Sequence, residues 1–293
     1  MAPVSAGAMW EVKVGMHVLV GVCARQHPEI FDAFLSSLFG LNGTGLELSY
    51  YFVFHNWDEG QGILAERTPT TAQVEVASYQ TGHEYLTDER THRWTRDLVQ
   101  DVTNMRNMIL RRALEMQSDA VFMVDSDLLL HPQTLRRLCA SGKDVIAEIF
   151  WTRWQPTDPE LPNAWEVDQY GIGPEALRQW RKPGEYRVGG TGACTLIRTS
   201  AIRKGLSYSP VPSVSWVGED RALQLRAAVL GIPIFIDTHY PAFHIYRLSL
   251  LPQGKRWYQT VQQRTRHGPE PAEAAVGEAR AAEPTRGPSA ELS

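Results

Sequence analysis

Short apolar runs without polar alternation constrain the fold of this chain more than any other feature. Residues 18–22 are Val-Leu-Val-Gly-Val, and further strand-like runs lie at 48–54 and 120–124. A strand without alternation is typical of a parallel sheet covered on both faces. Apolar residues recur at helical spacing between these runs, over 31–38 and 97–116, as core-facing helices require. The alternation predicts an α/β fold with a mostly parallel, Rossmann-like sheet flanked by helices on both faces.

The composition divides the chain into a folded body and two ends. Residues 1–13 show no apolar period, and the sequence from residue 268 onward is almost free of large apolar side chains. Such a segment cannot bury enough apolar surface to offset the entropy of ordering. We therefore expect a flexible leader over 1–13, a catalytic domain over 14–262 and a disordered tail over 263–293. Within the domain, the tryptophan- and proline-rich stretch 151–182 is predicted to be an irregular insert.

Charge and cysteine content exclude several classes of protein. The net charge of -4 provides no basic field for a polyanion, so nucleic acid is not expected as a partner. The three cysteines are odd in number and contain no CxxC pair, which argues against a disulfide framework or a structural zinc site. The apolar run near the start, residues 18–24, is far shorter than the roughly 20 residues that span a bilayer. We expect a cytoplasmic chain without a transmembrane segment.

The triplet Asp125-Ser126-Asp127 closes the apolar run 120–124. Ligands of open α/β sheets bind at the carboxyl ends of strands, so a charged ligand site is expected there. Two neighbouring carboxylates repel each other unless a cation lies between them, and Mg²⁺ or Mn²⁺ completes its coordination with water and phosphate oxygens. The alternative is a solvated turn in which an aspartate caps a helix that begins near Pro132.

Three further features could carry chemistry. Glu219 and Asp220 open a predicted helix; Asp220 could take a proton from a hydroxyl, whereas Glu219 alone is typical of an ordinary helix start. His244 follows an apolar strand, where it is either a core residue or a metal ligand. The glycines around Gly192 permit the close approach of a ligand or simply form a tight turn.

Taken in order, these features resemble the GT-A fold glycosyltransferases, particularly the family 2-like branch. The resemblance covers roughly residues 18–246, and its specificity lies in the order and spacing of the motifs. The motifs are Met105-Arg106-Asn107, Asp125-Ser126-Asp127 as the DxD motif, the small-residue strand that begins at Gly192, Glu219-Asp220 as the ED motif, and His244. The family's usual Asp-Asp-Gly-Ser loop after the second strand is replaced here by Asn56-Trp57-Asp58.

The resemblance implies a hexosyltransferase that moves a sugar from a nucleoside-diphosphate sugar to an acceptor hydroxyl with inversion. It implies Mn²⁺ or Mg²⁺ bound by Asp125, Asp127 and His244, with Asp220 as the catalytic base. The implied donor-binding residues are Val22, Ala24, Arg25, Asn56, Arg106, Asn107, Asp125, Ser126 and Gly192. The acceptor could be a glycan, a lipid-linked sugar, a peptide or a small metabolite. The insert 151–182 is a candidate acceptor site, or else a lid that only packs.

Two other functions remain open at this point. A nucleotidyltransferase of related fold makes a sugar nucleotide, and it needs a glycine-rich basic loop after the first strand. Residues 21–26 contain a single glycine, which disfavours this alternative. The other is a non-catalytic module that binds a nucleotide or a sugar, and a donor-hydrolysis assay would distinguish it from an enzyme.

Overall fold

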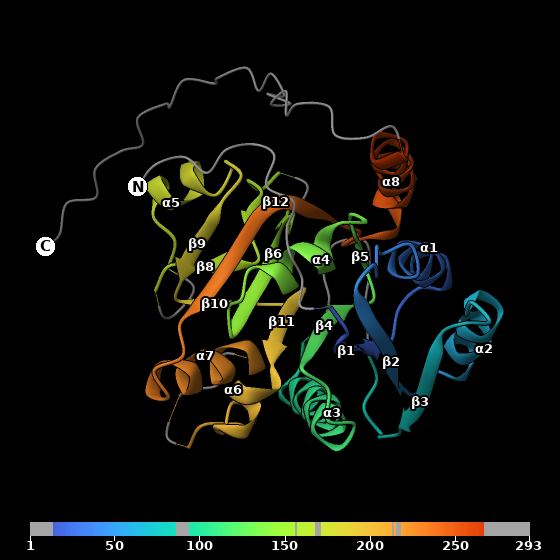
Figure 1. The fold of residues 1–293 in the computed structure, drawn as a ribbon, viewed down its shortest axis with the longest axis horizontal. Coiled ribbons are helices and arrows are strands. Elements are labelled where there is room, and N and C mark those ends of the chain that lie inside the picture. The colour runs from blue at the N-terminus through green and yellow to red at the C-terminus, as the bar shows by residue number, and fades with distance from the viewer. Residues whose placement is uncertain are drawn as a thin grey trace, which may run out of the picture.

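A ten-stranded sheet forms the centre of the molecule (Figure 1). The computed structural model describes residues 14–266 except 86–93, 156, 168–170, 213 and 215–217. The main path of the sheet has the order β3-β2-β1-β4-β11-β6-β12-β5, and β7 and β9 pair beside it. Its strands are β1 (Met16–Ala24), β2 (Leu46–His55), β3 (Gln73–Tyr79), β4 (Ala120–Asp125), β5 (Leu128–Leu129), β6 (Val145–Thr152), β7 (Leu161–Pro162), β9 (Glu185–Val188), β11 (Thr195–Arg198) and β12 (Ile234–His244). The short strands β8 (Ala164–Trp165) and β10 (Gly190–Thr191) pair separately.

The strand directions bring the candidate site residues to one edge. β1 is parallel to β2 and β4, and β2 is parallel to β3. β11 is antiparallel to both β4 and β6, so these two strands run the same way, and β12 is parallel to β6. The carboxyl ends of six strands therefore share one edge of the sheet; they are Ala24, His55, Tyr79, Asp125, Thr152 and His244. The predicted mostly parallel α/β fold is confirmed.

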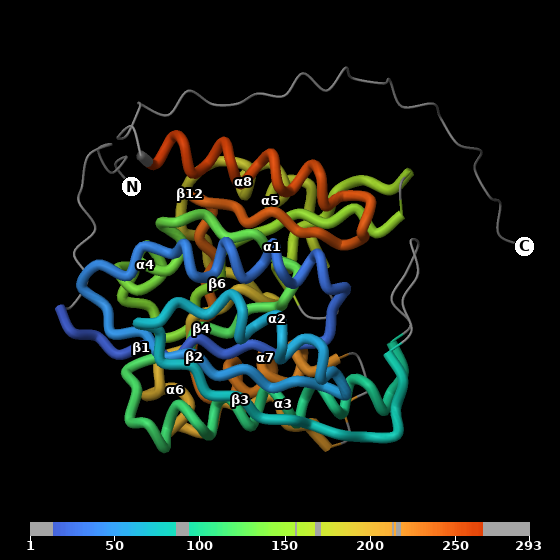
Figure 2. Tube along the Cα trace, turned by 90° about the vertical axis from the view of Figure 1, so that its right-hand side faces the viewer, coloured from blue at the N-terminus to red at the C-terminus, as the bar shows by residue number. Residues whose placement is uncertain are grey.

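Helices cover both faces of the sheet. Their bounds are α1 (Pro28–Leu38), α2 (Asp58–Arg67), α3 (Arg96–Glu115), α4 (Thr134–Ala140), α5 (Pro174–Gln179), α6 (Thr199–Arg203), α7 (Glu219–Val229) and α8 (Leu251–Arg266). The core under α1, α2 and α4 is separate from the core under α3, α6 and α7. Figure 2 shows α1 and α8 above the sheet and α3 and α6 below it. At Gly21 a Cβ would lie 2.1 Å from Ile109, so glycine lets α3 approach β1 closely.

The elements predicted from periodicity are present, and the unpredicted ones lack a clear pattern. Strands β1, β2 and β4 and helix α3 lie where expected. Helix α2 was not predicted, because only Gly60 and Leu64 of this polar helix are buried and it therefore shows no apolar period. The start of the predicted tail, residues 263–266, instead ends helix α8, whose Leu251 and Tyr258 pack with Ile30 of α1. The predicted leader and the rest of the tail lie outside the described residues.

Two expectations about the chain as a whole can be compared with the structure. All three cysteines are free, as predicted, and Cys139 and Cys194 are buried. Within the described ranges, no helix combines the length and the apolar character needed to cross a bilayer.

Candidate active site

The buried guanidinium of Arg106 joins three carboxylates at the edge of the sheet. Its Nη1 donates a hydrogen bond to Asp220 Oδ1 at 2.5 Å, and its Nη2 donates to Asp125 Oδ1 at 3.2 Å. Nη1 also lies 3.4 Å from Glu219 Oε1. We call Arg106, Asp125, Glu219 and Asp220 the carboxylate cluster. It links the end of β4 to the first turn of α7 through a side chain of α3.

The local sequence explains why two acids begin α7. Gly218 caps the helix with a φ of 106°, a left-handed conformation that favours glycine, and no side chain caps this end. Glu219 and Asp220 then occupy the first turn, where the helix dipole stabilises negative charge. Glu219 is nonetheless more than the ordinary helix-start residue that its sequence position indicated, because it also pairs with Arg106.

Two neighbours shape the space around the cluster. The ring of Tyr208 lies under the Arg106 guanidinium, 5.2 Å from its centroid to the guanidinium carbon. On the other side, a Cβ at Gly192 would lie 3.2 Å from Asp220 Oδ2. Gly192 therefore keeps the space beside the Asp220 carboxylate open.

Burial raises the pKa of two carboxyl groups in the cluster. Burial raises the pKa of Asp220 to about 7, an effect that Arg106 opposes and Glu219 reinforces. Burial also raises the pKa of Asp125, again against the attraction of Arg106. A carboxyl that titrates near neutral pH is matched to general base catalysis. The Asp220 side chain is 23% exposed, so a substrate hydroxyl can reach its carboxylate.

Asp127 and His244 form a second pair at the same edge. His244 Nε2 lies 3.3 Å from Asp127 Oδ2, and His244 Nδ1 lies 2.7 Å from the hydroxyl of Thr152. The backbone fixes this arrangement, since β5 pairs with β12 and the amide of Ile245 donates to the carbonyl of Asp127 at 2.9 Å. The Asp127 carboxylate and the Nε2 edge of the His244 ring therefore lie side by side, while Thr152 contacts the Nδ1 atom on the opposite edge of the ring.

This donor set fits a divalent cation that keeps most of its coordination for water and phosphate. Asp127 and His244 supply one oxygen and one nitrogen, whereas Asp125 contacts Arg106 instead. No group of three or more histidine, cysteine or acidic side chains is arranged to hold a metal within the described part of the chain. Mg²⁺ and related cations are commonly bound by one or two protein side chains together with substrate phosphates.

The predicted donor-binding residues near β1 and β2 divide into two groups. The side chains of Val22 and Ala24 are fully buried in the core, which leaves only their backbone for a ligand. Arg25 follows β1 and donates to the carbonyl of Asn56. Asn56 was predicted to contact the donor, but its amide group bonds with the backbone of the loop after β3 at 2.9–3.2 Å. It therefore joins two loops and has no free amide for a nucleoside.

Another predicted donor residue, Asn107, bonds with the segment before α7. Asn107 Nδ2 donates to the Ser209 hydroxyl at 3.1 Å, and its Oδ1 accepts from the Tyr208 amide at 3.0 Å. This amide therefore anchors the segment before α7. Ser126 lies between the two aspartates with 5% of its surface exposed.

The tryptophan-rich insert serves mainly as packing. Trp165 is buried and donates to Gln224 Oε1 of α7 at 2.7 Å, and Trp180 is 3% exposed. Trp154 is different, because it is 47% exposed and meets the ring of Tyr246 edge-on at 5.0 Å. The packing interpretation fits the first two residues, while Trp154 remains accessible near His244.

Two residues of the site were not identified from the sequence. Thr152 orients His244, and Tyr208 lies under Arg106. Neither belongs to a motif, and both reach the site only through the pairing of distant segments. Glu219 belongs to the ED motif, but its sequence position alone indicated only an ordinary helix start.

The chain is similar to known proteins of one class of enzyme. Residues 16–156 match the model of the N-terminal domain of glycosyltransferase family 25. Procollagen galactosyltransferase 2 of Homo sapiens is 26% identical over 267 residues, which cover 84% of this chain and 40% of that protein. The Mus musculus protein of the same name is 24% identical, with the same coverage. The chain thus spans about two fifths of the length of these relatives.

Solved structures with a similar fold include S. aureus TarS 1–349. It has a TM-score of 0.49 and 16% identity, and the alignment covers 78% of this chain and 60% of that one. TarS in complex with UDP-GlcNAc gives a TM-score of 0.45 and 14% identity, with 78% and 58% covered. The family model matches just under half of the chain, and over this stretch the chain is similar to a glycosyltransferase domain.

Proposed function

We propose that this chain is a hexosyltransferase that transfers a sugar from a nucleoside-diphosphate sugar to an acceptor hydroxyl. One observation carries the proposal: the carboxylate cluster and the Asp127–His244 pair lie at the same sheet edge, and Asp125 and Asp127 are separated by a single residue. A diphosphate site and a base are thereby brought next to each other. The name of the curated relatives makes galactose the first sugar to test.

In the proposed reaction, Asp220 takes the proton of the acceptor hydroxyl. The acceptor oxygen forms a bond to the anomeric carbon while the bond from that carbon to the diphosphate oxygen breaks, and the nucleoside diphosphate leaves. Attack opposite to the leaving group inverts the anomeric centre, as in inverting glycosidases. Asp220 suits this role because its pKa of about 7 keeps a useful fraction ionised at neutral pH.

Asp127 and His244 would hold Mn²⁺ or Mg²⁺, with Thr152 fixing the imidazole. A bound cation would stabilise the negative charge that develops on the diphosphate. Arg25 is the better candidate for a second contact to phosphate, because three carboxylates already engage Arg106. The cytoplasmic location stays a prediction.

The test combines binding and turnover. Thermal unfolding is recorded with UDP, GDP, ADP and CDP, each with and without Mn²⁺. Hydrolysis of the corresponding sugar nucleotide is then measured for the diphosphate that binds. We expect stabilisation by one diphosphate only when Mn²⁺ is present, since a ligand that binds the folded state raises its stability. Asp127→Ala and His244→Ala should abolish this metal-dependent shift.

Asp144→Ala is the matched control, because Asp144 immediately precedes β6 at the opposite edge of the sheet from Thr152. It should bind diphosphate and metal like the wild type. Full metal-dependent binding in Asp127→Ala would refute the metal assignment. Binding without any donor hydrolysis or transfer would instead favour the non-catalytic module.

A further inference from the structure

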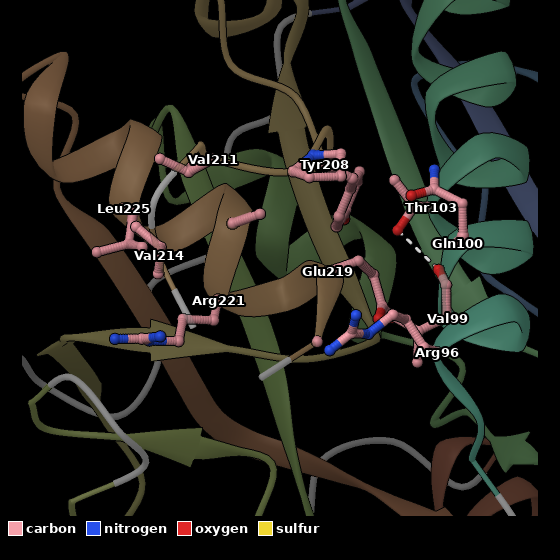
Figure 3. A pocket seen from close by; sticks show the side chains of 13 residues that line it. Arg96, Val99, Gln100, Thr103, Tyr208, Val211, Val214, Glu219, Arg221 and Leu225 are labelled. Atoms are coloured by element: carbon pink, nitrogen blue, oxygen red, sulfur yellow. Dashed lines mark hydrogen bonds between the residues drawn. The ribbon is translucent and has the colours of Figure 1, made fainter. Parts of the chain in front are cut away.

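A cavity of about 450 Å³ lies beside the carboxylate cluster, between α3 and α7. Figure 3 shows the two helices and the segment before α7 around it. Apolar side chains such as Val99, Val211 and Leu225 line it together with the polar or charged side chains of Arg96, Gln100 and Arg221. The Thr103 hydroxyl bonds to the carbonyl of Val99 at 2.7 Å, so it is already satisfied within α3. One part of the wall is therefore apolar and another part is polar, and the volume is within the range of small-molecule sites.

Glu219 connects this cavity to the proposed active site. It lines the cavity, and its side chain points from α7 toward α3 (Figure 3). The same carboxylate lies 3.4 Å from Arg106 Nη1, which bonds to Asp220. A molecule in the cavity would therefore lie one residue away from the proposed base.

The lining indicates what kind of molecule fits. The valine, alanine and leucine side chains offer no hydrogen bonds, so a sugar ring placed against this apolar part of the wall would lose contacts with water that the wall does not replace. An aliphatic or aryl group gains free energy by leaving water for such walls. A polar group of the same molecule would then face Glu219 and Asp220.

We propose that this cavity holds an apolar arm of the acceptor, and that the acceptor is a hydroxyl compound with an aliphatic or aryl arm instead of a bare sugar. This inference rests on the proposed glycosyl transfer and names its acceptor class. It also moves the main acceptor contact away from the insert 151–182, whose Trp165 and Trp180 are buried.

The experiment compares two probes that differ only in the arm, phenyl β-glucoside and glucose. Binding of each is measured by calorimetry or saturation-transfer NMR with UDP and Mn²⁺ present, so the result does not depend on turnover. Wild-type protein should bind phenyl β-glucoside at least about tenfold more tightly than glucose, the scale of a filled apolar pocket. Ala222→Trp, which fills the cavity, should remove this preference.

Ala228→Trp is the control, because Ala228 is an exposed residue of the same helix that does not line the cavity. Leu225→Asn is a second variant that cannot overpack the cavity, and it should weaken phenyl β-glucoside binding while leaving glucose binding unchanged. Equal binding of the two probes by wild type overturns the inference, as does a preference that survives both cavity variants. If the wild type shows no donor hydrolysis, that result would count against the proposed function and not against this inference about the cavity.

Discussion

Replacing Arg106 by methionine should strongly destabilise the fold, and more so at higher pH. The side chain is 5% exposed, and its guanidinium reaches the carboxylates of Asp125, Glu219 and Asp220. Methionine keeps much of the side-chain volume but removes the guanidinium. Among the contacts that the structure describes for these three acids, the guanidinium is the only positively charged group. Removing one partner of a buried ion pair costs about 3–5 kcal/mol, because the other charge stays buried without compensation.

The sign of the pH dependence follows from the pKa shifts. Arg106 lowers the pKa of Asp220 and Asp125, which burial has raised. Without it the folded-state pKa values rise further above those of the unfolded chain, so the folded state binds protons that the unfolded chain releases as the pH increases. The stability lost in Arg106→Met should therefore be smaller at pH 5 than at pH 8.

Urea unfolding at both pH values measures this loss. The control is Arg112→Met, which removes a more exposed arginine that contacts Glu75 at 2.7 Å and Glu115 at 3.1 Å. Exposed pairs of this kind contribute about 1 kcal/mol or less. Adding Asp220→Asn to Arg106→Met should recover part of the stability. The reasoning fails if the two arginine variants lose the same stability, or if the loss at Arg106 does not change with pH.

Three further predictions concern single side chains. Transfer activity, followed as kcat/KM, should rise about tenfold per pH unit up to about pH 7 and then level off, because Asp220 must be ionised to act as base. Asp220→Asn should lose transfer but keep diphosphate binding. Glu148 is fully buried, and its pKa lies well above the usual range through burial and the charge of Asp237. Wild type should therefore lose stability relative to Glu148→Gln by about 1.4 kcal/mol per pH unit above about pH 4.3, as urea unfolding at pH 5 and 7 would record; equal pH slopes would contradict this. Thr152→Val should weaken Mn²⁺ binding about 10- to 100-fold by releasing the His244 ring, measured by Mn²⁺ titration, and unchanged affinity would exclude the orienting role.

Local pattern was enough to predict the strands that carry the site. Residues 18–22 and 120–124 became β1 and β4, because an unbroken apolar run is stable only when both faces of its strand are covered. The position of Asp125 at a strand end follows directly from this pattern. Helix α2 did not follow from it, since a polar surface helix with few buried residues has no clear apolar period.

The sequence by itself determined which residues could hold charge at the sheet edge: one aspartate at the end of β4 and another two residues later, an acidic pair at the start of α7 and a histidine at the end of β12. Only the tertiary structure decided how these residues are divided. It pairs Asp127 with His244 through the β5–β12 contact, and it turns Asp125 toward Arg106 and the acids of α7. The physical reason is that a buried charge must find a partner, and that partner comes from segments whose distance along the chain says nothing about their distance in space.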